Sequence, residues 1–333
     1  MPLAYDPEFA SAFAPIAAQL ATVPKPAVHD VASRRTLLNS FFGAVPSSVS
    51  SIPLPNGVSH TSHTASLSNH TPVTIHRFFP TALSTSSPSP SSLPALLHLH
   101  GGGLISISVA HLAPTLASYV LASEIQIFSV EYRLAPEHPF PAALDDAHTA
   151  LLWLHAEAEQ FGLDTSRIGL LGESAGGGLA AALAIRTRDT GLTPGVKKQI
   201  LVYPMLDYRT REAGNGIGEL AFWTGEDNVT GWAAYLGRER YEGALEREGG
   251  VTGEMSPAVV GSVEGLPALY VECPQLDIYC KENLAYATRF VEAGIEVEVH
   301  VVPGLPHGFE ALGKGAGSVE RVQEWRIRAM RGL

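Results

Sequence analysis

Short apolar runs alternate with segments of helical spacing through most of the chain. Near-continuous apolar runs of a few residues are typical of strands buried on both faces, and apolar residues at every third or fourth position are typical of amphipathic helices. The predicted strands cover residues 95–100, 125–132, 167–173, 199–204, 268–272 and 296–302. The predicted helices cover residues 111–122, 143–160, 174–188, 281–293 and 318–333. This alternation predicts an α/β protein in which helices cover both faces of a mostly parallel sheet.

The segment before the first of these strands has a different pattern. Polar and apolar residues alternate over residues 58–79 on either side of the turn pair Ser68-Asn69, as in a two-stranded hairpin. This hairpin brings the expected sheet to eight strands. Residues 81–92 are rich in Pro and Ser, which predicts a polar loop.

Two further segments predict a cap. Residues 1–55 are rich in Ala and Pro and carry helical patches, and the Gly-rich residues 205–255 interrupt the alternation directly after a strand. We expect both segments to lie over the strand ends, above a core made of residues 56–204 and 256–333. Their aromatic side chains include Phe9, Phe13, Phe41, Phe42, Phe222, Trp223, Trp232 and Tyr235.

Composition narrows the function classes. The chain has 333 residues, of which 45% are hydrophobic, so that it can bury a sizeable core. Its net charge of −11 argues against a nucleic-acid partner, and charged, Gly or Pro residues interrupt every apolar run before it could span a membrane. The acidic start of the chain and the presence of only Cys273 and Cys280 favour a cytoplasmic protein with no leader segment. The oligomeric state stays open between a monomer and a homodimer. Whether the two cysteines are bonded to each other stays open.

Ser174 is the first candidate for chemistry. It lies where the predicted strand 167–173 meets a helix rich in small residues, and Gly172 and Gly176 flank it in the pattern G-x-S-x-G. A sharp strand-to-helix turn of this kind exposes the serine hydroxyl above the sheet and places the N–H group of Ala175 at a helix N-terminus. The alternative is a tight turn in which glycine only permits close packing of helix against strand.

A run of three glycines follows another strand. The backbone N–H groups of Gly102 and Gly103 can approach a ligand without interference from side chains. The N–H group of Gly101 lies near the same turn. This arrangement suits the binding of an oxyanion. The neighbouring His100 is expected to brace the loop rather than to act as a base.

A base and an acid follow later in the chain. His307 lies in a loop after the last predicted strand, where it can reach a nucleophile at another strand end of the same sheet edge. Asp277 follows strand 268–272 through the loop CPQL and is the preferred acid. Glu272 is the rival, but its place within the strand predicts a side chain that lies too deep. The chain order serine, acid, histidine is that of α/β hydrolases.

These motifs resemble a known family. HGGG at 100–103, YRLAPEHPFPAALDD at 132–146, GESAGG at 172–177 and PHGF at 306–309 are similar to those of hormone-sensitive-lipase-like, or family IV, esterases of the α/β-hydrolase fold. The resemblance extends from about residue 93 to the C-terminus. It implies a helical cap over an α/β-hydrolase core.

The resemblance also implies a set of site residues and an activity. Ser174, Asp277 and His307 would form the catalytic triad, and Gly102, Gly103 and Ala175 the oxyanion hole, with Gly101 as a further candidate. We expect a serine carboxylic-ester hydrolase that acts on small-molecule esters with short-to-medium acyl groups and needs no metal or organic cofactor. Leu104, Phe222 and Trp223 are the residues expected in the substrate pocket.

The sequence departs from the family at two places. Leu104 follows HGGG where an aromatic residue is frequent, and the acid lies in QLDIYCKEN where the family usually has DPLRDE, although Glu282 keeps one acidic position. These differences concern the shape of the acyl pocket.

Two groups of alternatives stay open. The same triad could serve deacetylation, lactone or amide hydrolysis of a small metabolite. A receptor without activity is the other class, since plant gibberellin receptors resemble this family but lack the catalytic histidine, which this chain retains.

The remaining polar clusters have structural interpretations. Glu131 and Arg133 are expected to pair at a strand end, and Asp145 and Asp146 to hold a loop and a helix start. His60, His63, His70 and His76 are more typical of solvated strand histidines than of metal ligands, because no carboxylate or cysteine cluster completes a site.

Overall fold

Eight strands form one sheet. The computed structural model describes residues 2–41, 43, 49–84, 92–214, 216–247 and 249–333. The strands are β1 (Val58–Ala65), β2 (Val73–Pro80), β3 (Leu93–Leu99), β4 (Gln126–Glu131), β5 (Leu163–Glu173), β6 (Lys198–Val202), β7 (Ala268–Leu276) and β8 (Val297–Pro306). Their order is β1-β2-β4-β3-β5-β6-β7-β8. Pairing is antiparallel from β1 through β2 to β4 and parallel in the rest of the sheet, which confirms the predicted fold class.

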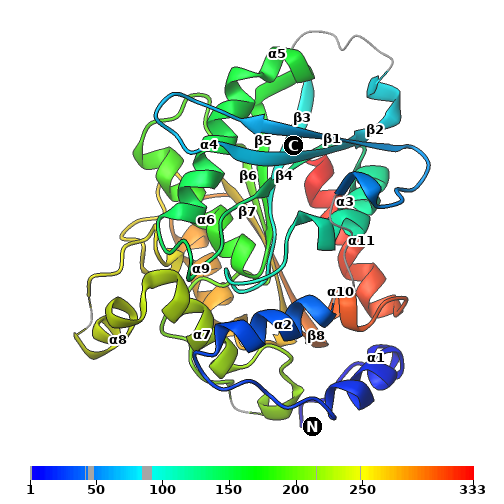
Figure 1. The fold of residues 1–333 in the computed structure, drawn as a ribbon, viewed down its shortest axis with the longest axis vertical. Coiled ribbons are helices and arrows are strands. Elements are labelled where there is room, and N and C mark those ends of the chain that lie inside the picture. The colour runs from blue at the N-terminus through cyan, green and yellow to red at the C-terminus, as the bar shows by residue number, and fades with distance from the viewer. Residues whose placement is uncertain (1, 42, 44–48, 85–91, 215, 248) are drawn as a thin grey trace.

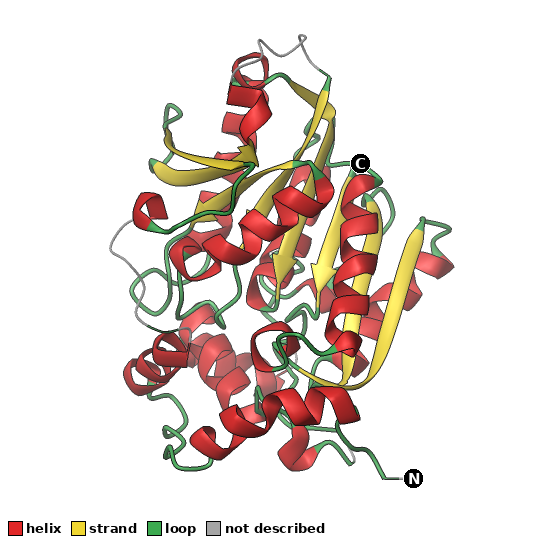
Figure 2. Cartoon of the chain, turned by 90° about the vertical axis from the view of Figure 1, so that its right-hand side faces the viewer, coloured by secondary structure: helices red, strands yellow, loops and turns green. Residues whose placement is uncertain are grey.

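Helices cover both faces of this sheet (Figure 2). The helices in the described part of the chain, those of the cap included, are α1 (Pro7–Leu20), α2 (Val31–Phe41), α3 (Val109–Ser123), α4 (Ala142–Ala156), α5 (Ala158–Phe161), α6 (Ala175–Asp189), α7 (Gly225–Leu236), α8 (Arg238–Arg247), α9 (Cys280–Glu292), α10 (Phe309–Leu312) and α11 (Gly317–Arg331). Side chains of β3 alternate between two apolar clusters, with Leu97 and Leu99 in one and Leu96 in the other. Because both faces are buried, the strands are nearly continuous apolar runs.

Several elements differ in extent from the predictions. The predicted helix 143–160 is divided into α4 and α5 at Glu157. Strands β7 and β8 continue to Leu276 and Pro306, so the segment CPQL is strand rather than loop. The pairing of these two strands shifts register between Pro274 and Leu276, directly before Asp277.

The two N-terminal helices have different neighbours. Helix α1 packs against α10 and α11, whereas α2 packs against α7 of the segment 205–255 (Figure 1). Both lie beyond the carboxyl ends of the parallel strands. Residues 85–91 of the predicted loop and Phe42 lie outside the described residues. No helix in the described part of the chain has the length and apolar character needed to cross a membrane.

The histidines of the edge hairpin pack against neighbouring rings. His60 stacks on His76 with ring centroids 5.2 Å apart, and His63 contacts Trp153 and Phe161 on the other face of the sheet. Among the described residues, no group of three or more His, Cys, Asp or Glu side chains is arranged to hold a metal ion. Burial lowers the pKa of His76 to about 4, and the nearby His60 adds to this effect.

This lowered pKa predicts a stability that depends on pH. Between the ordinary histidine pKa of about 6.5 and the value in the fold, the unfolded chain binds a proton at residue 76 that the folded chain does not. The free energy of unfolding should therefore fall as the pH drops through this window. We expect thermal denaturation at pH 7 and pH 5 to show a smaller loss of Tm in His76→Gln than in the wild type. The exposed His138 offers a control, since His138→Gln should keep the wild-type loss; equal losses in all three proteins would contradict the prediction.

Candidate active site

Three predicted site residues meet at the carboxyl edge of the sheet. Ser174 lies between β5 and α6, Asp277 directly after β7 and His307 directly after β8. His307 Nε2 is 2.8 Å from Ser174 Oγ, and His307 Nδ1 is 2.6 Å from Asp277 Oδ2. All three side chains are buried. The arrangement can move a proton from the serine hydroxyl to an imidazole whose orientation a carboxylate fixes.

The backbone at Ser174 is strained and tightly packed. Its φ of 55° lies in the left-handed region, which non-glycine residues rarely adopt. A Cβ atom at Gly172 would lie 2.3 Å from the carbonyl oxygen of Gly176, and one at Gly176 would lie 1.9 Å from that of Leu99. Glycine is therefore required on both sides of the serine, as the sequence pattern predicts.

Glu272 does not reach His307, because it belongs to a separate buried cluster. Its carboxylate accepts hydrogen bonds from Arg326 and from the hydroxyl of Tyr270. Burial raises the pKa of Glu272, an effect that the neighbouring Arg326 opposes. Arg326 also pairs with Glu310, so the guanidinium bridges two carboxylates beneath the site. The geometry therefore favours Asp277 over Glu272 as the acid.

The glycine loop lies beside the serine. A Cβ atom at Gly101 would lie 3.4 Å from that of Ser174, and one at Gly103 would lie 2.6 Å from the Trp223 ring. Gly102 has a φ of 102° and accepts hydrogen bonds at its carbonyl oxygen from the turn that follows. Ala175 begins α6, so its N–H group has no carbonyl within the helix to bond. The loop and the helix start thus offer backbone donors on the two sides of Ser174.

His100 braces this loop, as expected. Its Nδ1 is 2.8 Å from the carbonyl oxygen of Gly101, and its ring stacks on Tyr132 with centroids 4.1 Å apart. The Tyr132 hydroxyl donates to the carbonyl oxygen of His100 over 2.6 Å. Burial lowers the pKa of His100 to about 3, so the imidazole stays neutral at ordinary pH.

The structure adds polar neighbours that sequence reasoning missed. The Tyr203 ring lies 4.5 Å from that of His307, and its hydroxyl donates to Glu310 Oε2 over 2.8 Å. On the other side, Glu173 bonds His98 Nε2 over 2.8 Å. Burial would raise the pKa of Glu173, but the His98 imidazole keeps it below its ordinary value. Each of these residues lies within or next to a recognised motif or strand. That position is the only feature of the sequence that could have pointed to them.

A cavity of about 580 Å³ opens above Ser174. Phe222 and Trp223 line it, together with His307 and with Leu38 of α2. Leu104 does not line this cavity. It lines a separate hollow of about 10 Å³ beside Ala175, together with Trp232 and Tyr235 among others. The reason is that the turn after Gly103 directs the Leu104 side chain away from the serine and into the core, where only 5% of it is exposed.

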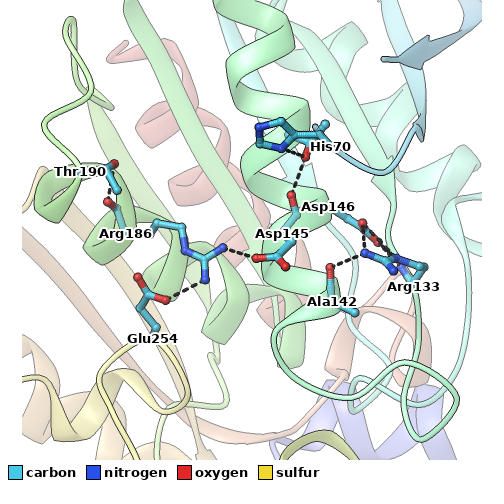
Figure 3. A network of polar contacts seen from close by, with 9 residues as sticks. His70, Arg133, Ala142, Asp145, Asp146, Arg186, Thr190 and Glu254 are labelled. Carbon is cyan, nitrogen blue, oxygen red and sulfur yellow. Dashed lines mark hydrogen bonds and ion pairs between the residues drawn. The ribbon is translucent and has the colours of Figure 1, made fainter. Parts of the chain in front are cut away.

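The prediction that Glu131 and Arg133 form a pair is wrong. Arg133 pairs with Asp146 through several hydrogen bonds of 2.8 to 3.1 Å (Figure 3), whereas Glu131 Oε2 accepts from the N–H group of Val109 at the start of α3. Residues two apart on a strand share a face only while the strand lasts, and β4 ends at Glu131.

The same figure shows how α4 is fixed to its neighbours. Arg186 of α6 bonds Asp145 over 2.6 Å and Glu254, near the end of the cap segment, over 2.7 Å (Figure 3). Asp145 and Asp146 therefore hold the start of α4, which agrees with their structural interpretation. Cys273 and Cys280 are both free thiols.

The family follows from comparison with known proteins. A family model described as the α/β hydrolase fold matches residues 96–311. The chain belongs to this family. The match and the relatives below also place it among the hormone-sensitive-lipase-like esterases.

Relatives of this α/β hydrolase are named as esterases. It is 30% identical over 222 residues to an esterase, LipI, of Mycobacterium tuberculosis (strain ATCC 25618 / H37Rv), with 67% of each chain covered. It is 31% identical over 227 residues to an ethyl acetate hydrolase of Pseudomonas putida, covering 66% of this chain and 67% of the relative. A solved bacterial heroin esterase superposes with a TM-score of 0.83 at 30% identity, covering 98% of this chain and 97% of the other. The chain is accordingly a carboxylic-ester hydrolase.

The separation of Asp277 from Glu272 predicts different effects of two substitutions. Asp277→Asn should leave the wrong imidazole tautomer facing Ser174 and lower kcat by a factor on the order of 10⁴. Glu272→Gln removes a charge that Arg326 compensates, so it should lower the Tm and leave the kcat of the folded protein much closer to the wild type. Steady-state kinetics and thermal denaturation of both variants measure this. A damaging Glu272→Gln beside a nearly silent Asp277→Asn would reverse the assignment.

Proposed function

We propose that Ser174 is the nucleophile of this hydrolase, His307 its general base and Asp277 the acid that orients the imidazole. The observation that carries the proposal is the unbroken chain of hydrogen bonds from Asp277 through His307 to Ser174. His307 Nε2 takes the Ser174 proton as Oγ attacks the ester carbonyl carbon, and then gives that proton to the departing alcohol. Water, activated by the same imidazole, releases the acid from the acyl-enzyme.

The oxyanion of the tetrahedral intermediate would be held by backbone N–H groups. Gly102, Gly103 and Ala175 are the proposed donors, with Gly101 at the near end of the loop. The close approach of the glycine loop to Ser174 supports this role, because donors that are fixed before the reaction stabilise developing charge without reorganisation.

The substrates we propose are small-molecule esters with short-to-medium acyl groups. The cavity above Ser174 is bounded by the apolar side chains of Phe222, Trp223 and Leu38, and its volume of about 580 Å³ limits what it can enclose. Each methylene that it buries gains about 0.8 kcal/mol, but only while room remains. The names of two relatives, an ethyl acetate hydrolase and a heroin esterase, are those of enzymes acting on small esters, which supports the same class.

Replacing the proposed nucleophile should abolish hydrolysis. Ser174→Ala removes the hydroxyl and adds no bulk to a crowded turn, so the fold should persist. We expect no labelling by a fluorophosphonate probe, no hydrolysis of p-nitrophenyl acetate above the buffer rate, and an unchanged far-UV circular dichroism spectrum. Activity within tenfold of the wild type, in protein free of contaminating esterase, would exclude Ser174 as the nucleophile.

The cavity walls should set the acyl preference. With p-nitrophenyl esters from acetate to palmitate, kcat/KM should be highest for short-to-medium acyl groups and fall steeply for long ones. Phe222→Ala enlarges the cavity and should move the optimum to longer acyl groups. Trp232→Phe, in the separate hollow, should leave the profile unchanged. A wild-type preference for long acyl groups, or the same profile in Phe222→Ala as in the wild type, would contradict this account.

A further inference from the structure

The turn after the glycine loop is held in a strained form. Leu104 and Ile107 have φ values of 64° and 58°, in the left-handed region. Such values are unfavourable for side chains with a Cβ atom, and most of all for β-branched isoleucine. Residues in this state persist only where the surrounding structure holds them.

Within the turn, hydrogen bonds tie it to the glycine loop. The N–H groups of Ile105 and Ser106 donate to the carbonyl oxygen of Gly102 over 3.1 and 3.0 Å, and Ser106 Oγ donates to the same oxygen over 2.8 Å. A displacement of the turn would therefore displace Gly102 and, with it, the N–H groups on either side of its carbonyl group.

Helix α2 supplies contacts from outside. Arg35 Nε donates to the carbonyl oxygen of Ile105 over 2.6 Å, and Asn39 Oδ1 accepts from the N–H group of Ile107 over 3.0 Å. The rest of the Arg35 guanidinium bonds the carbonyl oxygen of Ala135 over 2.9 Å and pairs with both oxygens of Glu137. Arg35 thus links the turn to a second loop of the core.

The second cap segment presses on the same loop from α7. A Cβ atom at Gly231 would lie 2.8 Å from the carbonyl oxygen of Gly103, and the Trp223 ring covers Gly103. Arg34 joins the two parts of the cap, because it pairs with Asp227 of α7 and donates to the carbonyl oxygens of Pro26 and Ala27. It has no bond to the turn among its described contacts.

From these contacts we infer that α2 is a strut of the oxyanion site, in which Arg35 and Asn39 are positioning residues that hold the strained turn and so aim the N–H groups of Gly102 and Gly103. The inference rests on the proposed function of Ser174 and the glycine loop. It assigns to the cap a part in stabilising the transition state, in addition to covering the cavity. A small misplacement of donors is sufficient to slow a reaction about a hundredfold.

Substitutions at Asn39 separate the hydrogen bond from the packing. Asn39→Leu keeps the approximate size and removes the acceptor, whereas Asn39→Asp keeps an acceptor oxygen. Active sites are first counted by titration with a fluorophosphonate, so that unfolded protein does not enter the rate. We expect Asn39→Leu to lower kcat per titrated site by about tenfold or more with little change in KM, and Asn39→Asp to restore most of the rate. The affinity of a boronic acid, whose tetrahedral adduct occupies the oxyanion site, should fall in parallel with kcat/KM.

Two other residues of α2 are matched controls. Thr36→Ala alters an exposed position of the same helix and should leave kcat and Tm near the wild type. Arg34→Gln removes the tie to α7 and should lower the Tm while kcat per titrated site changes much less than in Asn39→Leu. The inference is overturned if Asn39→Leu keeps its kcat within twofold, if Asn39→Asp loses as much as Asn39→Leu, or if Arg34→Gln shows the same loss. A wild-type protein that takes no fluorophosphonate label would instead refute the proposed function, and the strut with it.

Discussion

The contact between Gly176 and the end of β3 is the constraint on which the rest of the site depends. Helix α6 starts so close to this strand that the carbonyl oxygen of Leu99 occupies the place of a side chain at residue 176. The same approach forces the left-handed turn at Ser174 and brings Gly101 against it. Ser174 and the glycine loop are therefore fixed by one packing contact. Because β5 and β3 are adjacent and parallel, both segments leave the sheet at the same edge.

Buried charges extend this rigidity to the histidine. Arg326 of α11 bridges Glu272 in β7 and Glu310 in α10, and Glu310 receives the hydroxyl of Tyr203, whose ring packs on His307. Removing one member would leave a buried charge without its partner, which is far more costly than the pair itself is stabilising. A polar network of this kind fixes the Tyr203 ring that packs on the imidazole of His307. The network also gives Glu272 a structural role, although its place in the sequence alone made it a rival of Asp277 for the role of the acid.

The sequence predicts what depends on backbone geometry better than what depends on the direction of a side chain. The order of the candidate site residues along the chain, Ser174 then Asp277 then His307, follows from motifs at strand ends. The structure brings these three residues together. Arg133 was misplaced because β4 ends at Glu131, so the alternation of faces no longer holds at residue 133. Leu104 was misplaced because the left-handed turn after Gly103 directs its side chain away from Ser174. The extension of β7 to Leu276 was missed for a related reason, since Pro274 is typical of a loop and the register shift that accommodates it has no signal in the sequence.

The cap shows a deeper limit of pattern reading. Both N-terminal helices have the composition of elements laid over a core, yet α1 packs on α10 and α11 while α2 reaches the glycine loop. The contacts that distinguish them are bonds from polar side chains to backbone groups about 70 residues away in the chain. Backbone groups are the same at every residue, so hydrophobic periodicity cannot reveal such a pairing. The pairing is revealed in the structure by the strained backbone at Leu104 and Ile107. The chain would not adopt such a turn alone, so the strain points to the elements that hold the turn. A helix that bonds that turn while its Leu38 lines the cavity links the enclosure of the cavity to the geometry of the proposed oxyanion site.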